Sequence, residues 1–243
     1  MIKVGLCGFT LGMAAYPRHF SVVEVQQTFY EPPADQVLRR WAAAMPAPFE
    51  FTLKAWQLVT HASKSPTYRR LKRPLDAAER AACGGFRDTP IVREGLERSL
   101  ACAKLLRATT ILFQSPASFG PEPENVERLR YFFTRVANPL CPAGVHYAWE
   151  PRGDAWTKQA ELAATLCSEL GLDYVVDPFV DAIPPTGTRP AYLRLHGVTG
   201  ARHVYTDREL NRLRELVPPD AYVMFNNIPR VSDAKRFLEL LAA

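Results

Sequence analysis

The chain has 243 residues, 47% of them hydrophobic, which suits one globular domain over residues 1–243. Its formal net charge of +5 at pH 7 leans mildly toward anionic partners. The five cysteines form no CxxC pair, so neither a zinc knuckle nor a disulfide framework is expected. Reduced, partly buried thiols fit this usage better.

The sequence runs from Met1 directly into a strand-like segment, which indicates that there is no signal peptide. No apolar run approaches the ~18 residues that a membrane-spanning helix needs. We therefore expect a soluble, cytoplasmic protein that makes no membrane contact. The oligomeric state cannot be read from the sequence.

Eight strand-like segments alternate with helical patterns. The expected strands are 3–9, 22–27, 49–55, 109–115, 145–150, 173–178, 191–196 and 222–227. The expected helices are 34–45, 93–107, 124–136, 157–170, 207–216 and 232–241, the last with Ser232 as its N-cap. Alternating strands and helices imply a parallel sheet. Eight strands in a chain of about 250 residues are typical of an α/β, TIM-type (β/α)₈ barrel, which we predict here.

Three connections are expected to be irregular. The first crossover, 10–21, is short for a helix, and a long loop follows the third strand. Residues 178–190 are rich in proline and should form a loop. The rival fold is a doubly wound open sheet, but it usually needs a glycine-rich phosphate turn after the first strand, and GFTLG (8–12) matches that turn poorly.

Polar residues share one face of the expected strands, because side chains of a strand alternate between its faces. In AYLRLH (191–196), a guanidinium and an imidazole alternate with leucines. The same phase places these residues inside the barrel: Glu24, Gln26, Thr52, Lys54, Gln114, His146, Glu150, Asp177, Arg194, His196 and Asn226. The apolar residues between them should pack beneath the helices. We expect a charged pocket at the carboxyl ends of the strands, the usual place of active sites in this fold; a purely structural polar network is the alternative.

These strands and their flanks resemble a known family. The segments VVEVQQTFY (22–30), FEFTLKAWQLVTH (49–61), FQSPASF (113–119), WEPRG (149–153), YLRLHG (192–197) and FNN (225–227) resemble the YecE-like family, known as domain of unknown function 72. The resemblance covers nearly the whole chain in the family's motif order. It implies a TIM barrel and brings no established reaction.

The resemblance implies functional positions at Glu24, Gln26, Tyr30, Lys54, His61, Gln114, Glu150, Arg152, Asp177, Arg194, His196, Asn226 and Asn227. The first loop departs from the family, because GLCGFT stands where a sequence close to GTSGW is usual, and Gln26 replaces the usual asparagine. The rim near the first two strands is therefore expected to differ from that of relatives.

Three cations, Lys54, Arg152 and Arg194, are expected to face one small space. Such a group suits a phosphate or carboxylate, since arginine offers a bidentate fork. The alternative is that each cation pairs with Glu24, Glu150 or Asp177.

Proton transfer is assigned to His196, whose ordinary pKa of ~6.5 is near working pH, with Glu150 or Glu24 as its partner. An interior histidine that is merely bonded to a carboxylate is the alternative. No cofactor is evident. A divalent metal is allowed by the residue types, with Glu150, Asp177 and His196 as its ligands and His146 and Glu24 as further candidates.

Gln26, Gln114 and Asn226 are expected to orient the substrate, with Tyr30, His61, Asp177 and Asn227 completing the binding shell. The loop 197–207, with Tyr205, is interpreted as either a lid over the pocket or an ordinary loop.

The segment KSPTYRRLKR (64–73) has five basic residues and no acidic one, so it is either a nucleic-acid contact or a solvated basic loop. The sequence thus favours an enzyme, a hydrolase, lyase or isomerase, that acts on an anionic or phosphorylated small molecule or a phosphodiester. The alternative is a non-catalytic protein that binds nucleic acid.

Overall fold

The computed structural model describes residues 1–185 and 189–242. Its strands are β1 (Ile2–Cys7), β2 (Val22–Val25), β3 (Glu50–Lys54), β4 (Thr110–Gln114), β5 (His146–Glu150), β6 (Asp173–Val176), β7 (Ala191–Leu195) and β8 (Ala221–Phe225). Each strand pairs in parallel with the next, and β8 pairs with β1. The sheet is therefore a closed eight-stranded barrel, which confirms the predicted fold and rules out the open sheet.

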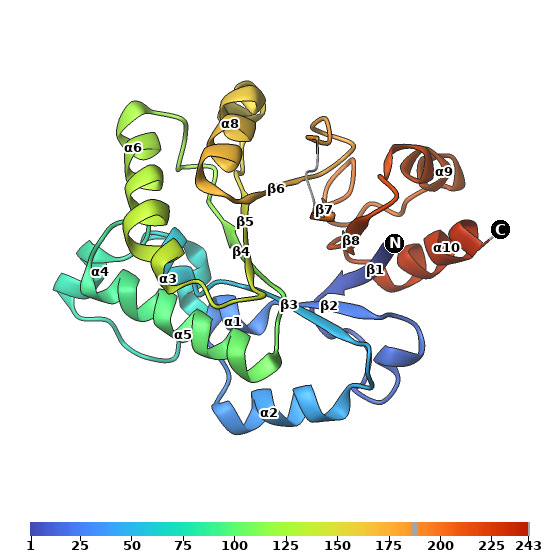
Figure 1. Ribbon diagram of the computed structural model, residues 1–243, viewed down its shortest axis with the longest axis horizontal. Helices are drawn as coiled ribbons and strands as arrows, with labels where there is room; N and C mark the ends of the chain where they lie inside the picture. The colour runs from blue at the N-terminus through green and yellow to red at the C-terminus, as the bar shows by residue number, and fades with distance from the viewer. Residues whose placement is uncertain (186–188, 243) are drawn as a thin grey trace.

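The longer helices surround the barrel (Figure 1). They are α2 (Asp35–Ala44), α5 (Pro90–Leu106), α6 (Pro123–Tyr131), α8 (Ala160–Leu170), α9 (Asp207–Leu216) and α10 (Arg230–Ala242). Shorter turns are α1 (Gln27–Tyr30), α3 (Gln57–Thr60), α4 (Ala77–Ala82), α7 (Asp154–Thr157), the 3₁₀ turns η1 (Tyr16–Arg18), η2 (Pro66–Arg70) and η4 (Asn138–Leu140), and the π-helical η3 (Phe132–Ala137). Among the described residues, none of these helices has the length and apolar content to cross a bilayer.

The first crossover has no α-helix in it, as predicted. It contains only η1, and the buried Tyr16 replaces the missing helix. The Tyr16 hydroxyl donates to the carbonyl of Val22 at 2.9 Å and accepts from the amide of Leu6 at 3.1 Å. One side chain therefore ties β1 to the start of β2.

The connection from β3 to β4 is long, as predicted, and contains α3, η2, α4 and α5. The proline-rich loop 178–190 has turns but no helix or strand in its described residues, and 186–188 of that loop lie outside them. The expected N-cap of the last helix is wrong. That helix begins at Arg230, so Ser232 lies inside its first turn, where its hydroxyl donates to the carbonyl of Pro229.

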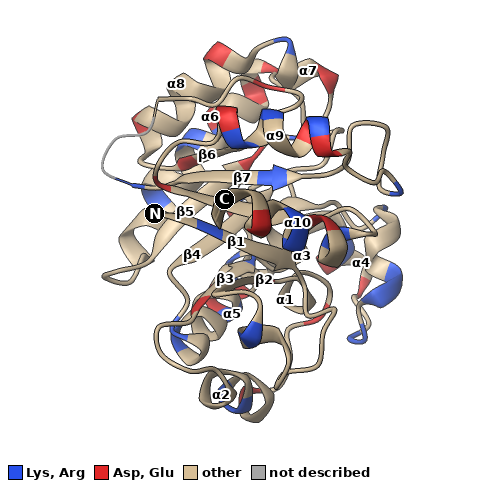
Figure 2. Cartoon of the chain, turned by 90° about the vertical axis from the view of Figure 1, so that its right-hand side faces the viewer, with Lys and Arg blue, Asp and Glu red and all other residues tan. Residues whose placement is uncertain are grey.

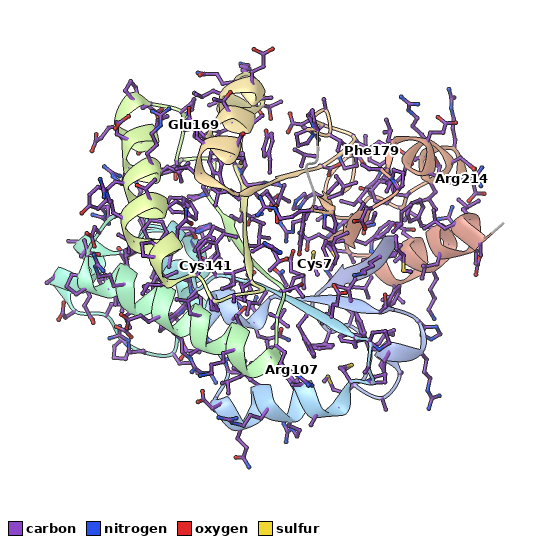
Figure 3. All side chains as sticks on the ribbon, viewed as in Figure 1. Cys7, Arg107, Cys141, Glu169, Phe179 and Arg214 are labelled. Atoms are coloured by element: carbon purple, nitrogen blue, oxygen red, sulfur yellow. The ribbon has the colours of Figure 1, made fainter. Side chains whose placement is uncertain are left out.

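Strand parity divides the core into two groups. The outward residues pack against the helices, and they include every predicted one: Val23, Val25, Phe51, Leu53, Ile111, Phe113, Tyr147, Trp149, Val176, Leu193, Leu195, Val223 and Phe225. A separate buried group fills the barrel: Cys7, Val22, Leu112, Ala148, Val175, Tyr192, Tyr222 and Met224. Figure 3 shows Cys7 where the strands converge. The interior is thus apolar at mid-height, which leaves the polar residues for the ends.

Candidate functional site

Polar side chains from most of the strands converge at the carboxyl end of the barrel. Glu24, Lys54, Glu150 and Arg194 are each less than 9% exposed. Buried polar groups are costly unless they satisfy one another, so their pairing decides what the site can do.

Arg194 is the centre of this group and is only 1% exposed. It grips Glu24 with two bonds, from Nε to Oε2 at 3.0 Å and from Nη2 to Oε1 at 2.8 Å. Its Nη1 donates to Glu150 Oε2. Burial alone would lower the pKa of Arg194, but Glu150 and Glu24 raise it well above its usual value. The guanidinium is therefore a permanent, internally paired charge.

A second layer supports Glu24 from below. Tyr192 donates its hydroxyl proton to Glu24 Oε2 at 2.8 Å, and Thr52 Oγ1 lies 2.7 Å from the same phenol oxygen. Arg194 Nη2 also donates to the sulfur of Cys7 at 3.6 Å. Burial and the charge of Glu24 raise the pKa of the Cys7 thiol, so it stays protonated. Glu24 thus holds Arg194 in place and does not reach the mouth of the barrel.

Glu150 connects this buried layer to the mouth. His196 Nε2 lies 2.7 Å from Glu150 Oε1, and Arg152 donates to the same oxygen at 3.1 Å. Burial opposes ionisation of Glu150, but Arg194, His196 and Arg152 outweigh it and hold the pKa of the carboxyl well below its usual value. Glu150 is therefore a carboxylate throughout the neutral range.

His196 is held at three points, two on its imidazole and one on its backbone. Besides the Glu150 contact, its Nδ1 lies 3.1 Å from the side-chain amide nitrogen of Asn226, and its backbone amide donates to Asp177 Oδ2 at 2.9 Å. When Nε2–H donates to Glu150, Nδ1 carries the lone pair. This is the tautomer that accepts from the Asn226 amide.

Lys54 and Gln114 lie on the other side of Glu150. Lys54 Nζ donates to Gln114 Oε1 at 2.6 Å, and Gln114 Nε2 donates to Glu150 Oε2 at 2.8 Å. The Lys54 nitrogen also lies 3.6 Å from the ring centroid of Phe29. Burial, together with the Arg194 charge, lowers the pKa of the Lys54 amine to about 7.

A cavity of about 420 Å³ opens at this end of the barrel, over β5 to β8. Its described lining includes the predicted residues Glu150, Arg152, Asp177, His196 and Asn226. Arg152 is the one lysine or arginine among those lining residues. The three expected cations therefore do not share one cavity, because Arg194 is paired beneath it and Lys54 lies beside it.

Several carboxylates also line the cavity. Asp154 and Asp181 add to Glu150 and Asp177. Burial and the neighbouring Asp177 raise the pKa of the Asp181 carboxyl. The lining is therefore rich in hydrogen-bond acceptors, with one guanidinium among them.

Gln26, Tyr30 and His61 are among the predicted site residues outside this lining. Gln26 donates to Glu24. The guanidinium of Arg70 stacks over the Tyr30 ring at 3.6 Å. His61 is buried against Phe29, with Nδ1 2.7 Å from the Thr60 hydroxyl. Burial and the Lys54 charge lower the pKa of His61 to about 3, so its ring is neutral.

Asn227 and Tyr205 are both buried and hydrogen-bonded within the protein. Asn227 is fully buried, and its amide donates to Asp233 Oδ2 at 2.7 Å at the start of α10. Tyr205 is also buried, stacks on Phe179, and accepts the Gly197 amide at 2.9 Å. The loop 197–207 is therefore pinned to the core by its tyrosine, which argues against the lid interpretation.

His146 cannot join the other metal-ligand candidates. It begins β5 whereas Glu150 ends it, and four residues of strand span about 13 Å. His146 instead borders a different cavity, of about 550 Å³, at the amino ends of β5 to β7. The expectation that His146 faces the mouth is wrong. Residues that share the inner face of a strand lie at different heights in the barrel, so His146 lies at the amino end and Glu150 at the carboxyl end.

The donors at the mouth do not fit a divalent metal ion. No group of three or more His, Cys, Asp or Glu side chains that could hold one occurs in residues 1–185 and 189–242. Glu150 already accepts hydrogen bonds from Arg194, Gln114 and Arg152, and a metal ion would have to displace these cationic and amide donors. The function proposed below therefore assigns no catalytic step to a metal ion.

Two residues that contribute to the site, Tyr192 and Phe29, were not predicted from the sequence. Tyr192 shares its strand face with Arg194, so parity alone could have placed it inside the barrel beneath that residue. Phe29, which covers the Lys54 amine, carries no such signal because it lies in the four-residue helix α1.

The barrel is similar to several solved structures. A DUF72 family protein from Enterococcus faecalis V583 aligns with a TM-score of 0.71 at 20% identity, over 100% of this chain and 98% of that chain. A DUF72 family protein from Thermotoga maritima MSB8 aligns with a TM-score of 0.65 at 22% identity, over 100% of both chains. D-psicose 3-epimerase, solved in the presence of D-fructose, aligns with a TM-score of 0.59 at 14% identity, over 98% of this chain and 97% of that chain. At these identities the likeness shows the fold alone.

No curated protein matches the chain. A family model described as "Protein of unknown function DUF72" matches residues 9–243. This range contains all the motifs that predict the family from the sequence, from VVEVQQTFY to FNN. The chain therefore belongs to the DUF72, or YecE-like, family.

Proposed function

We propose that the protein is an enzyme that moves protons on a small polar substrate at the carboxyl end of the barrel. The observation that carries this proposal is the contact of 2.7 Å between His196 Nε2 and Glu150 Oε1, at the wall of an open cavity. A histidine oriented by a buried carboxylate is a common arrangement for general acid–base catalysis.

The roles follow from the hydrogen bonds. Glu150 stays ionised, so it holds Nε2–H and stabilises the imidazolium that forms when His196 accepts a proton. His196 Nδ1 is the base, and a substrate hydroxyl or acidic C–H replaces the Asn226 amide next to it. Glu24 is a positioning residue, since it acts only through Arg194.

The substrate is a small molecule, because a cavity of about 420 Å³ lies in the range of small-molecule sites. Arg152 holds its anionic group, a carboxylate or a phosphate. The carboxylates around it accept hydrogen bonds from substrate hydroxyls. A hydrolase, a lyase and an isomerase would each use this arrangement.

A proton-exchange assay tests this without a known substrate. The protein is incubated in deuterated water with a mixture of hydroxy acids, sugars and sugar phosphates, and deuterium uptake is followed by NMR. We expect one component to gain carbon-bound deuterium, and His196→Gln to slow this by about 10²–10⁴-fold.

The matched control is His203→Gln. His203 also pairs with a carboxylate, Glu209, at 3.1 Å, but it does not line the cavity. Exchange that is equally fast in wild type and His196→Gln would overturn the proposal.

A second candidate function is nucleic-acid binding by the segment 64–73. The side chains of Lys64, Arg69, Arg70 and Lys72 are exposed there. Figure 2 shows lysine and arginine gathered beside α4. Exposed cations in the same segment as the aromatic ring of Tyr68 favour binding of a single-stranded nucleic acid.

A further inference from the structure

Lys54 is a buried amine with few partners. Its side chain is 6% exposed and ends at the carboxyl edge of β3. In the described residues, the one hydrogen-bond acceptor for Nζ is Gln114 Oε1. A buried ammonium has three N–H groups to satisfy, so a single amide acceptor and a ring face favour the neutral amine.

The charges around Lys54 are already paired. Arg194 takes both nearby carboxylates through its own three nitrogens. The remaining neighbours are not anionic, because the Cys7 thiol is protonated and the His61 ring is neutral. The titratable groups that surround Lys54 are Cys7, Glu24, His61, Glu150 and Arg194. This environment explains why the pKa of Lys54 lies near 7.

The amine also lies close to the proposed catalytic pair. Gln114 contacts Lys54 with its oxygen and Glu150 with its nitrogen. The half-buried Gln114 side chain therefore lies between Lys54 Nζ and Glu150, a residue of the cavity wall.

We propose that Lys54 is a nucleophilic amine that forms an imine with the carbonyl carbon of a small aldehyde or ketone. The lone pair of Nζ attacks the carbonyl carbon, and the C=O π electrons move to oxygen. A proton passes from nitrogen to that oxygen, and loss of water leaves the C=N bond. The step needs no oxidant or reductant. Lysines that burial or a neighbouring cation keeps neutral act in this way.

The probe is glycolaldehyde with sodium cyanoborohydride at pH 7, which reduces each imine to a stable amine. Peptide mass spectrometry then compares the modification rate of Lys54 with those of the other six lysines. At this pH about half of an amine of pKa 7 is neutral, against less than about 0.1% of an ordinary lysine. We expect Lys54 to react at least tenfold faster than any other lysine. This factor is smaller than the ratio of the neutral fractions because burial slows access of the aldehyde to Nζ.

Lys3 is the matched control, since its Nζ pairs with Glu50 inside the same barrel. Gln114→Glu would place a carboxylate against Nζ and should slow Lys54 labelling at least tenfold in a protein that circular dichroism shows to be folded. Lys54 labelling no faster than that of Lys3, or unaffected by Gln114→Glu, would overturn the proposal. His196→Gln should retain the labelling, which separates this inference from the proposed proton transfer.

Discussion

At the scale of the residue, Arg194 decides the character of the site. A guanidinium with 1% exposure would be very costly without partners, and each of the two carboxylates would be equally costly without Arg194. The three groups are therefore stable only together. This pairing leaves the partly exposed Arg152, and not Arg194, in the lining of the cavity, where it would bind the anionic group of the substrate that we propose.

The first prediction concerns this buried group. Arg194→Met should lower the free energy of unfolding by about 3–5 kcal/mol at pH 7, because buried Glu24 loses its arginine partner and buried Glu150 keeps only the partly exposed Arg152. Chemical denaturation measures this loss. The control is Arg152→Met, whose side chain is 41% exposed and should change stability by about 1 kcal/mol or less.

The pH dependence of that loss has a definite sign. The pKa of Glu150 is depressed in the folded wild type, so its contribution is present above its unfolded pKa of ~4.3 and is lost as pH falls through the folded value. In Arg194→Met the largest source of this depression is removed, while Arg152 and His196 remain. The gap between wild type and variant should therefore shrink as pH falls below about 4, and a gap that is constant with pH would contradict the assignment.

The second prediction concerns Lys54, whose pKa is also depressed in the folded state, so the pH dependence has the same sign but falls in a higher pH window. Its folded pKa of about 7 is below the ~10.4 of an unfolded lysine, so the unfolded state binds more protons between these values. Stability from this group therefore rises with pH in that window. Relative to Lys54→Met, wild type should gain about 1–2 kcal/mol between pH 7 and 8.5, as measured by denaturation at each pH. Lys64→Met, at an exposed lysine, is the control, and equal behaviour of the two variants would sink the idea.

At the scale of the element, the turn after β5 aims Arg152 into the cavity. Gly153 adopts φ +101° and ψ 153°, a region that is essentially restricted to glycine. A Cβ at this position would lie 2.8 Å from the Cβ of Ala117, in the loop after β4. The close approach of these two loops therefore fixes where α7 begins.

The third prediction follows from this turn. Gly153→Ala should lower the free energy of unfolding by about 1–3 kcal/mol through backbone strain, and by more if the clash with Ala117 is not relieved. Thermal denaturation detects the loss. Gly144→Ala is the control, because that glycine also has positive φ but a Cβ added there would meet nothing within 4 Å. The clash is refuted if the two variants lose equal stability.

The sequence predicted the strands and helices better than it predicted where they end or which side chains pair across the barrel. Alternation with period two placed Glu24, Lys54 and Arg194 inside the barrel, because a closed barrel leaves each strand only two faces. It could not show that Arg194 takes both carboxylates, which depends on distances across the barrel. It also could not separate Asn226 from Asn227, since adjacent residues beyond a strand end are free to turn toward different partners.

At the scale of the whole molecule, basic and acidic residues are interspersed along the outer helices (Figure 2). Many of them pair, as in Arg128 with Glu124 and Arg130 with Glu169. The segment 64–73 differs because it has no acidic residue of its own, although Arg73 pairs with Glu79. It is attached at the carboxyl side of the barrel, where Tyr68 donates to the carbonyl of His61 at 2.7 Å.

The fourth prediction tests whether this segment binds nucleic acid. If Lys64, Arg69, Arg70 and Lys72 each neutralise one phosphate, the logarithm of the binding constant for a single-stranded oligonucleotide should fall with the logarithm of salt concentration, with a slope of about −3. Fluorescence anisotropy from low to moderate salt measures this slope. Replacing all four with alanine should bring the slope close to zero and weaken binding uniformly across sequences.

A control with the same loss of charge separates this segment from the net charge of the molecule. It replaces Arg128, Arg130, Arg212 and Arg214, on α6 and α9, with alanine. Because counterion release depends on the phosphates actually contacted, this control should keep most of the wild-type slope. Equal losses in both variants would mean that only the overall positive charge attracts the oligonucleotide. His196→Gln should leave binding unchanged, since its imidazole lies in the cavity over β5 to β8 while the segment follows β3.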